Sequence, residues 1–541
     1  MIGLTRPLLC VLLLGPTAAH QDDRGEPPVR APYDGLDTLV TNDWWNRKPS
    51  KIIDLKVPRD EVVAFGVYTV HEGVLKLSAQ LFPLYPDESR TVRLEVERAG
   101  EWVELAWQRV DDLGWCTTFR IENWSGDTDV PYRLRHGPSA VFEGLIRKDP
   151  TDKDVIVLAG LSCNSNQDRG MRPLYVRNLR QHDPDLVFFA GDQSYDHKQH
   201  TAAWLKWGLQ FRDVFRDRPC IAIPDDHDIG QGNVWGEGGK VAKLAGGADG
   251  GYFHHPEYVR LVDRAQTSHL PDPYDATPIE RGIGVYYTNL HVGGVDFAII
   301  EDRKFKSGPA GKIPQQGPRP DHIRNPEYDP SSIDLEGLTL LGDRQHEFLE
   351  SWGEDWDGVS MKAVLSQTGF CGGAHLHGNK KNRLHADLDS NGWPQQARNE
   401  ALRLIHAANA VHIGGDQHLP TVIQHGIEEY RDGPWAFIVP AIINNYYSRW
   451  WWPEDEAAGG NRDPESALPW TGDYLDGFNN RITMHAYANP ESVSGGSGYG
   501  IVRFDKQAKA VTFECWPREA DVSSEGARQF PGWPVTVAMT R

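Results

Sequence analysis

The sequence predicts an α/β fold in two parts, a β-sandwich of immunoglobulin type followed by a larger domain of layered β-sheets flanked by helices. Two observations carry this prediction. From about residue 62 to residue 135, short alternating apolar runs follow one another without a helical stretch. After Lys148-Asp149-Pro150, continuous apolar runs alternate with helical segments, a pattern typical of sheets that are covered on both faces. We therefore place the domain boundary near residue 149.

The elements follow in order along the chain. In the first part, turn signals separate six runs of strand-like residues, and the end of the chain resembles a closing β-hairpin. The predicted strands of the first part are 64–70, 74–82, 91–98, 101–110, 116–121 and 130–136, and those of the hairpin are 498–505 and 510–517.

The second part alternates strands with helices. Between these elements lie three long loops rich in Gly, Pro and Asp, and loops of that length in a compact domain are usually functional or disordered. The strands are predicted at 154–160, 185–191, 219–224, 295–301, 361–367 and 410–415, the helices at 172–182, 202–215, 342–352 and 397–408, and the loops at 229–278, 307–330 and 450–477.

Residues 1–19 have the layout of a secretory signal peptide: Arg6, an apolar run from Leu8 to Leu14, and small residues ending at Ala19. The run is too short to span a bilayer, and no later stretch provides the roughly 20 apolar residues of a membrane helix. An N-terminal strand is the alternative, but the residues that follow are polar and Pro-rich. We expect an exported protein, secreted or periplasmic, with no transmembrane segment, an irregular linker at 20–54, the β-sandwich at 55–148 and the layered domain at 149–541.

The composition of the chain limits the kinds of molecule that it is expected to bind. The formal net charge of −20 argues against broad nucleic-acid binding, because phosphate backbones are held mainly by Lys and Arg. A small anionic substrate is still compatible with this charge if metal ions reverse the local field. Six cysteines are present, and five stay once Cys10 leaves with the signal peptide. An odd number cannot pair completely within the chain, so at least one thiol is free or bound.

Polar side chains capable of binding metal follow five of the predicted strands. Parallel strands carry their ligand sites at the carboxyl edge of the sheet, so these side chains are predicted to meet at one rim. Taken singly, each has an ordinary explanation as a buried thiol, a turn residue or a helix cap. Their joint occurrence favours a metal site. The residues are Cys163, Asp192, Tyr195, Asp225-Asp226-His227-Asp228, Asp302-Arg303, Asp416 and His418.

The order of the motifs GDQSYD, DDHD and GGDQH resembles the calcineurin-like metallophosphoesterase superfamily. Asp226 stands where Asn is usual, and Asp416 where the first His of the last motif is usual. With Cys163 and the DRKFK segment, these departures make the chain similar to the alkaline phosphatase D (PhoD-like) family. That family often ends the second motif in His-Glu, where this chain has Asp228. The resemblance implies a calcineurin-like domain preceded by a β-sandwich, over residues 55 to about 518.

The resemblance also implies the ligands of two metals. Cys163, Asp192, Tyr195 and His418 hold the first, and this thiolate, phenolate, carboxylate and imidazole set suits Fe(III). Asp192 bridges to the second metal, which Asp226 holds together with Asp416. Two carboxylates make this site hard and rich in oxygen, which favours Ca(II), with Mg, Mn and Zn as alternatives.

A small phosphate ester is the expected substrate. Paired cations clamp a phosphate and lower the pKa of a bound water, so that hydroxide attacks phosphorus. His227 is a candidate to protonate the leaving oxygen or to donate to a phosphoryl oxygen, or alternatively to orient Asp226. Arg303 is a candidate to face the pocket, or alternatively to form an ion pair. In the ADLDSNGWPQQAR segment, Asp387 or Asp389 is a weaker candidate for contact with a metal.

Three histidines near this segment, His375, His377 and His385, are equally compatible with solvated loop positions. Two rival functions stay open. The same metal pair serves phosphate diesters, as in a phosphodiesterase or phospholipase-like enzyme. A non-catalytic envelope protein that binds glycans through its sandwich and its many Trp residues is the other alternative, and the intact set of ligand residues disfavours it.

Overall fold

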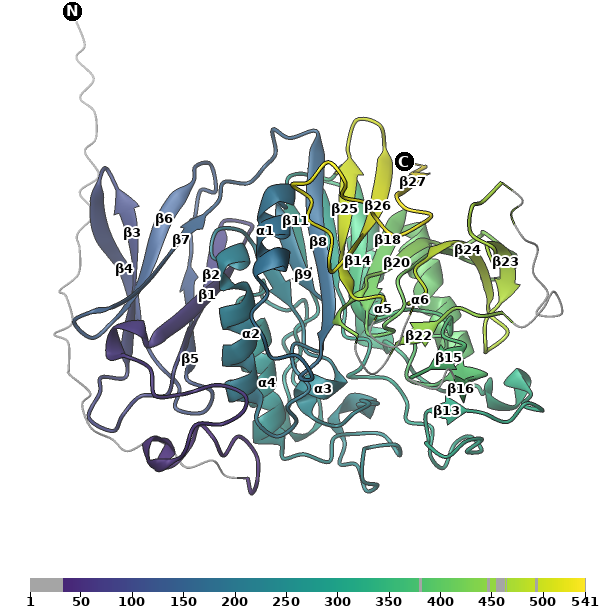
Figure 1. The fold of residues 1–541 in the computed structure, drawn as a ribbon, viewed down its shortest axis with the longest axis horizontal. Coiled ribbons are helices and arrows are strands. Elements are labelled where there is room, and N and C mark those ends of the chain that lie inside the picture. The colour runs from purple at the N-terminus through teal and green to yellow at the C-terminus, as the bar shows by residue number, and fades with distance from the viewer. Residues whose placement is uncertain are drawn as a thin grey trace, which may run out of the picture.

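The computed structural model describes residues 33–378, 382–444, 448–453, 463, 465–491 and 495–540. The predicted signal peptide, residues 1–19, lies outside these ranges. The prediction of a sheet-rich α/β fold is confirmed, with two small sheets near the N-terminus and two larger ones in the rest of the chain (Figure 1). No helix of the described residues is long and apolar enough to cross a membrane.

The N-terminal part contains two antiparallel sheets. The first has the order β1-β2-β5, with β1 Val63–His71, β2 Val74–Leu81 and β5 Cys116–Ile121. The second has the order β4-β3-β6-β7, with β4 Glu101–Arg109, β3 Thr91–Arg98, β6 Val130–His136 and β7 Ala140–Ile146. Strand β7 is absent from the sequence prediction. Leu77 from one sheet and Leu94 from the other belong to the same buried cluster, so the two sheets share a core.

Two larger sheets form the centre of the molecule. One has the order β10-β9-β8-β25-β26-β27, in which β8, β9 and β10 run parallel and β21 also pairs with β8. Its strands are β8 Val155–Asn164, β9 Leu186–Phe189, β10 Cys220–Ala222, β21 Ala441–Ile443, β25 Gly498–Asp505, β26 Ala510–Pro517 and β27 Val535–Ala538. The predicted hairpin is the β25–β26 pair.

The other large sheet has the order β11-β12-β14-β18-β20-β19-β24-β23, with β12, β14, β18 and β20 parallel. Its strands are β11 Thr288–Val292, β12 Val295–Ile299, β14 Met361–Thr368, β18 Ala410–Gly415, β19 Thr421–His425, β20 Trp435–Ile438, β23 Gly472–Leu475 and β24 Arg481–Tyr487. The remaining strands are two-residue pieces: β13 His322–Ile323, β15 Leu376–His377, β16 Asn382–Arg383, β17 Ala386–Asp387 and β22 Arg449–Trp450.

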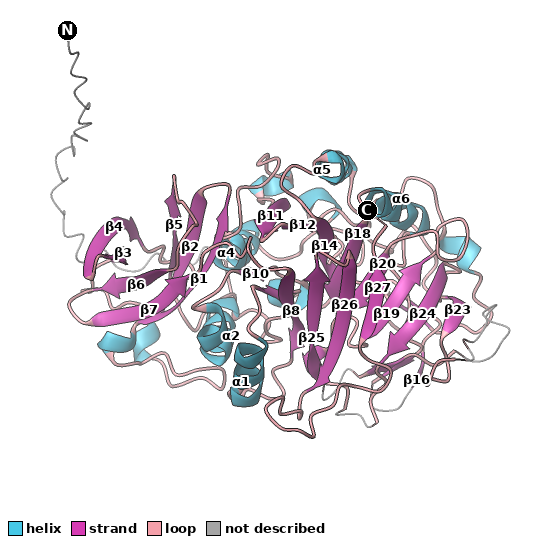
Figure 2. Ribbon diagram, turned by 90° about the horizontal axis from the view of Figure 1, so that it is seen from above, coloured by secondary structure: helices cyan, strands magenta, loops and turns pink. Residues whose placement is uncertain are grey.

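The large sheets pack face to face, and helices cover their outer faces (Figure 2). Leu158 of β8 and Phe297 of β12 share the core between the sheets. On the first sheet lie α1 Pro173–His182 and α2 His200–Phe215, and on the second lie α5 Asp343–Glu354 and α6 Gln395–Ala407. All four helices agree with the sequence prediction. The sheets form continuous apolar runs because both of their faces are buried.

Seven strands of three or more residues in the second part are absent from the sequence prediction: β11, β19, β20, β21, β23, β24 and β27. Two segments that were expected to be irregular also differ from the prediction. The long loop 229–278 contains α4 Pro256–Thr267, which begins with Pro256 and Glu257 and buries one apolar side against Tyr33 and Ile283. This helix is absent from the sequence prediction because its apolar residues form only a short pattern, which lies in a segment rich in Gly. The described part of the linker, from residue 33, packs on the body: Trp44 is buried, and Asp37 accepts a hydrogen bond from the backbone N–H of Thr201 at 2.9 Å.

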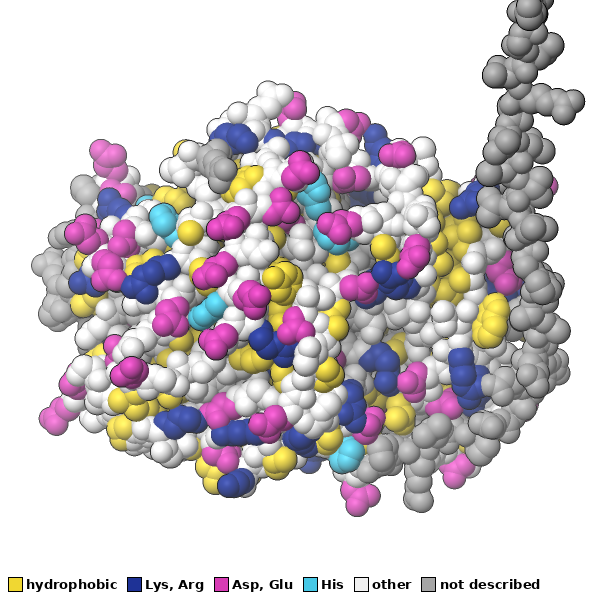
Figure 3. Space-filling view, turned by 180° about the vertical axis from the view of Figure 1, so that it is seen from behind, with side chains coloured by type: hydrophobic (Ala, Val, Ile, Leu, Met, Phe, Trp, Pro, Cys, Tyr) yellow, Lys and Arg dark blue, Asp and Glu magenta, His cyan; other side chains and the backbone are white. Residues whose placement is uncertain are grey.

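Charged side chains of both signs are interspersed over the face seen in Figure 3, where Lys and Arg stand among Asp and Glu.

Candidate metal centre

The candidate centre lies where the parallel strands of both large sheets end. Strand β8 ends at Ser162-Cys163-Asn164, β9 is followed by Asp192, and β18 is followed by Asp416. Backbone bonds join these ends, with the N–H of Cys163 donating to the carbonyl of Gly191 at 3.2 Å. The hydroxyl of Ser162 accepts from the N–H of Asp416 at 3.0 Å, which ties one sheet to the other.

Four of the six predicted metal ligands have a left-handed backbone. The φ angles are +56° at Cys163, +58° at Asp192, +61° at Asp416 and +52° at His418. Such angles are uncommon outside glycine and cost free energy, so they persist only where the surroundings enforce them. Here they turn each side chain out of its strand direction and toward the shared edge. This clustering is the signature of a site whose geometry has been kept at the expense of local stability.

The first predicted ligand set is brought together. The Cys163 sulfur, a carboxylate oxygen of Asp192 and a ring nitrogen of His418 all lie within 4.8 Å of one another, and all three side chains are buried. The hydroxyl of Tyr195 lies 3.0 Å from Nε2 of His418. Sequence analysis predicted these four residues as one set, and the fold places them at one point.

His418 presents one defined nitrogen to this set. Its Nδ1 lies 2.9 Å from Oδ1 of Asn444, and the amide nitrogen of Asn444 faces the carbonyl of His418. Because an amide oxygen only accepts, Nδ1 carries the proton. The lone pair is therefore on Nε2, beside Tyr195. A metal-binding histidine oriented in this way by a polar partner is a common arrangement. Asn444 was not predicted, because nothing in the sequence near it marks a metal site.

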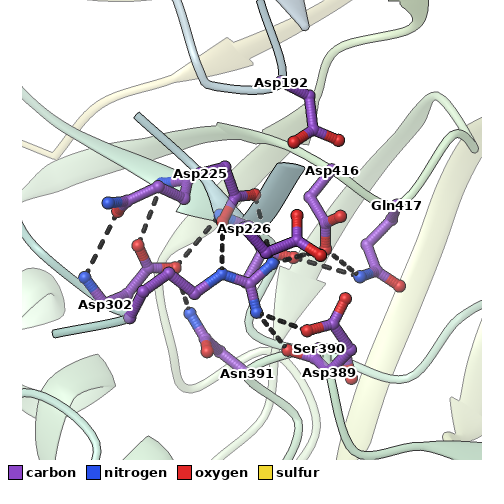
Figure 4. Close-up of polar contacts among 12 residues, drawn as sticks. Asp192, Asp225, Asp226, Asp302, Asp389, Ser390, Asn391, Asp416 and Gln417 are labelled. Atoms are coloured by element: carbon purple, nitrogen blue, oxygen red, sulfur yellow. Dashed lines mark hydrogen bonds and ion pairs between the residues drawn. The ribbon is translucent and has the colours of Figure 1, made fainter. Parts of the chain in front are cut away.

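The second predicted set is arranged differently. Carboxylate oxygens of Asp225, Asp226 and Asp416 lie within 4.8 Å of one another, and Asp192 groups with Asp226 and His227. Asp226 therefore lies near Asp225 and Asp416 and also near Asp192. Asp192, which is predicted to bridge the two metals, groups with Cys163 on one side and with Asp226 on the other. Asp225 is identified in the sequence as part of its motif and not as a metal ligand. Figure 4 shows the carboxylates of Asp225, Asp226, Asp389 and Asp416 converging, with Asp192 on one side.

The short helix α3 Asp226–Ile229 places this set. Asp225 and Asp228 form a capping box, in which each carboxylate accepts a hydrogen bond from the backbone of the other. Asp228 also accepts from the N–H of Asp192 at 2.8 Å and so joins the loop after β9 to that after β10. The spacing Asp225 to Asp228 is the sequence signal for this cap. Asp228 thus has a structural part at the position where the PhoD-like family often has Glu.

Arg303 points into a group of buried carboxylates. Its Nε and Nη2 donate to the two oxygens of Asp225 at 2.7 and 3.1 Å, and Nη1 donates to Asp389 at 2.8 Å. Nη2 also lies 3.0 Å from Asp416. These donors of Arg303 are therefore engaged by carboxylates, and its contact with a phosphate stays a prediction. The alternative, an ion pair, is what the structure has, but with these three residues and not with Asp302.

The single positive charge of Arg303 does not balance the negative charges of the carboxylates around it. Burial and neighbouring carboxylates raise the pKa of Asp192 and of Asp226 well above its usual range. Oδ2 of Asp192 and Oδ1 of Asp226 are buried and accept no hydrogen bond. Burial, reinforced by Asp192 and Asp416, also raises the pKa of the Cys163 thiol. Buried oxygens without donors are rare and need a partner, and a cation is the partner that also favours the charged forms.

His227 lies over the centre. Its ring packs on that of Tyr195 with centroids 3.9 Å apart, and its Nδ1 lies 2.6 Å from Nε2 of His197. Nε2 lies 4.0 Å from Asp226. Burial, His197 and His418 together lower the pKa of His227, which favours the neutral imidazole. His197 was missed in the sequence because it follows the GDQSYD motif without being part of it.

The weaker candidates separate. Asp389 bonds Arg303 and so borders the centre, whereas Asp387 groups with Asp321 and His322 in a second cluster. His375 is buried against Trp451, which corrects the solvated-loop alternative for this residue, and His377 and His385 are partly buried. All five described cysteines are free and buried, in agreement with the predicted free thiol.

The fold is PhoD-like. The chain is similar to a solved structure described as that of PhoD, with a TM-score of 0.61 and 14% sequence identity, covering 88% of this chain and 90% of that one. A β-glucuronidase of Parabacteroides merdae with glycerol in its active site covers 69% of this chain and 42% of its own at 10% identity, but its TM-score of 0.18 carries no argument. No protein-family model and no curated protein sequence matches the chain.

Proposed function

We propose that the protein is an exported metal-dependent phosphatase of the alkaline phosphatase D type that hydrolyses small phosphate esters. The observation that carries this proposal is the pair of buried carboxylate oxygens without donors, on Asp192 and Asp226, between a Cys163-His418 pair and the Asp225-Asp416 pair. The PhoD-like fold supports it. We also propose a signal peptide at 1–19, a β-sandwich domain at 55–148 and a calcineurin-like metallophosphoesterase domain at 149–541.

The residues present fit two different metals. Cys163, Asp192, Tyr195 and His418 offer sulfur, oxygen and nitrogen, the donor set of Fe(III). Asp225, Asp226 and Asp416 offer oxygen alone, which favours Ca(II), with Mg, Mn or Zn as alternatives. When bound, such a pair supplies positive charge for the phosphoryl oxygens and activates water as the nucleophile.

The chain itself supplies orientation and charge balance. Arg303 keeps Asp225, Asp389 and Asp416 in place and limits their mutual repulsion before a cation binds. His227 is the group we assign to the leaving oxygen or to a phosphoryl oxygen, because it borders Asp226 and its Nδ1 is held by His197. As a neutral imidazole it acts as a hydrogen-bond donor in this position.

The test is turnover before and after metal removal. We expect the chelator-treated protein to lose hydrolysis of a chromogenic phosphate monoester and to regain it when Fe(III) and Ca(II) are returned. A phosphate diester measured in parallel distinguishes the phosphodiesterase or phospholipase-like alternative, which predicts faster turnover of the diester. Failure to hydrolyse either ester in the presence of metals would favour the glycan-binding alternative and contradict the proposal.

A further inference from the structure

A second group of metal-competent side chains lies beside the centre and has no part in the proposed function. Ligand atoms of Asp321, His322 and Asp387 lie within 4.8 Å of one another, and all three residues are buried. They come from two loops, 307–330 and the segment around 386–391. The N–H of Asp389 donates to Asp387 at 3.2 Å, and Asp389 also bonds Arg303, so this cluster borders the candidate centre.

The backbone aligns two of these residues. Strands β13 and β17 pair antiparallel with His322 directly opposite Asp387. Residues opposite each other in an antiparallel pair have their Cβ atoms about 4.5–5.5 Å apart and project on the same face. The N–H of Leu388 donates to the carbonyl of Asp321 at 2.8 Å, so the third residue is tied to the same pair of strands.

His322 is the observation that points to a ligand. The side chain is 2% exposed, and neither ring nitrogen has a hydrogen-bond partner in the structure. Nε2 lies 3.4 Å from Oδ2 of Asp321, where no hydrogen bond is formed, and 4.0 Å from Oδ2 of Asp387, which is beyond hydrogen-bond distance. A buried imidazole whose ring nitrogens have no hydrogen-bond partner is available to bind a metal ion.

The two arginines at the cluster are compatible with a cation. Arg319 bonds both oxygens of Asp321, at 3.0 and 2.7 Å, but half of its side chain is exposed. Arg449 donates to one oxygen of Asp387 at 2.9 Å. A carboxylate oxygen accepts more than one partner, and outer partners of this kind orient metal ligands. An anion would instead meet two carboxylates at close range, which disfavours it.

We propose that Asp321, His322 and Asp387 form a separate binding site for a divalent transition-metal cation of the zinc type. One imidazole and two carboxylates are a donor set that suits Zn(II) and is poor for Ca(II), which takes oxygen ligands. The site joins the loop 307–330 to the segment that carries Asp389, the partner of Arg303. Its function is to fix these two loops against each other at the border of the candidate centre.

Zinc binding to the chelator-treated full chain tests the site. We expect the wild-type protein to bind one more zinc ion per chain than His322→Gln, by elemental analysis after dialysis against Zn(II). Zinc should also raise the melting temperature of His322→Gln less than that of the wild type. The matched control is His406→Gln, because His406 is an exposed residue at the end of α6, and this variant should bind as many ions as the wild type.

Two further variants make the result decisive. Asp321→Asn removes a ligand at nearly constant size and should lose the same ion if His322→Gln does not fold. Cys163→Ser should keep the ion that depends on His322, so the test is independent of the proposed phosphatase function. Equal zinc content in the wild type and in a folded His322 or Asp321 variant would overturn the site. Loss of all bound ions in these variants would also overturn the proposed site, because it would show that His322 maintains the candidate metal centre and does not bind an ion of its own.

Discussion

At the scale of single residues, the candidate centre depends on side chains whose backbone is unfavourable. Cys163, Asp192, Asp416 and His418 all have a left-handed φ, which costs about 1–2 kcal/mol for a residue with a side chain. Tertiary contacts hold the backbone at these positions, as where the hydroxyl of Ser162 on the other sheet accepts a hydrogen bond from the N–H of Asp416. A chain selected for stability alone would have glycine at these positions. The presence of ligand-type residues there is an argument for function.

Cys163→Ser separates a metal ligand from a buried thiol. Serine keeps the size but removes the soft sulfur, so we expect less bound iron, a changed visible absorption spectrum and weaker phosphatase activity. The control is Cys371→Ser, because Cys371 is also free and buried but lies outside the grouped ligand sets. Elemental analysis and the visible spectrum are the measurements. Full iron content with an unchanged spectrum in the Cys163 variant would rule out thiolate ligation.

His227→Ala tests the role of the imidazole over the centre. We expect both metals to stay and turnover to fall about 100-fold, the usual loss when a general acid or an oxyanion donor is removed. His255→Ala is the control, since His255 is an exposed helix cap on α4. The deciding measurements are the metal content and the turnover rate of the same variant preparation. A variant that has lost a metal would show that His227 binds or orients a ligand instead.

At the scale of elements, the turn after β9 determines how closely two loops approach. Gly191 has a φ of +109°, and a Cβ at this position would lie 2.4 Å from the Cβ of Asp225. No other residue fits without moving Asp192 away from Asp225. The GD pair of the motif therefore has a steric reason, which is separate from the metal chemistry of its Asp.

Gly191→Ala should therefore destabilise the protein and weaken metal binding. Overpacking costs about 1–3 kcal/mol, added to the about 1–2 kcal/mol of a left-handed residue. Gly100→Ala is the matched control, because Gly100 has a φ of +83° in the β3–β4 hairpin and nothing lies within 4 Å of its added Cβ. Chemical denaturation measures both variants. Equal losses of stability in the two variants would show that an added Cβ at residue 191 does not clash with Asp225.

The sequence predicted six parallel strands and four helices of the second part, because these strands are continuous apolar runs between amphipathic helices. It missed shorter strands of the same sheets, such as β11, β19, β20 and β24. Their positions after parallel strands predicted that Cys163, Asp192, Tyr195 and His418 lie at one rim, and the resemblance to the PhoD-like family implied that the four form one set. The sequence could not predict how Arg303 is shared among three carboxylates, because Asp225, Asp389 and Asp416 come from separate loops. The helix α4 and the His322 to Asp387 pairing also depend on tertiary packing that no local pattern reveals.

At the scale of the whole molecule, the two large sheets bring together carboxylates that are distant along the chain. In the metal-free protein the pKa values of Asp192, Asp225 and Asp226 are raised, chiefly by burial. A carboxyl whose folded pKa is raised contributes stability below its unfolded pKa near 3.9, and this contribution is lost as the pH rises through the folded pKa. Cations bind the deprotonated forms, so they offset this loss.

Metal stabilisation should consequently increase with pH. We expect the rise in melting temperature caused by Fe(III) and Ca(II) to be larger at pH 8 than at pH 5, because fewer protons must leave the carboxyls when the metals bind. Thermal unfolding of the same preparation with and without metals measures this difference. Stabilisation that is equal at both pH values would mean that the ligands are already ionised without metal.

The most direct test of the account is to count metals and measure phosphate ester hydrolysis on one preparation purified without chelators. We choose Asp192→Asn as the comparison, because Asp192 groups with Cys163 and His418 and also with Asp226, and one oxygen of its buried carboxylate accepts no hydrogen bond. The account predicts iron and calcium in the wild type together with hydrolysis of a chromogenic phosphate ester, and loss of metal and of activity in the variant. A wild-type protein that holds no metal and hydrolyses neither a monoester nor a diester would contradict it.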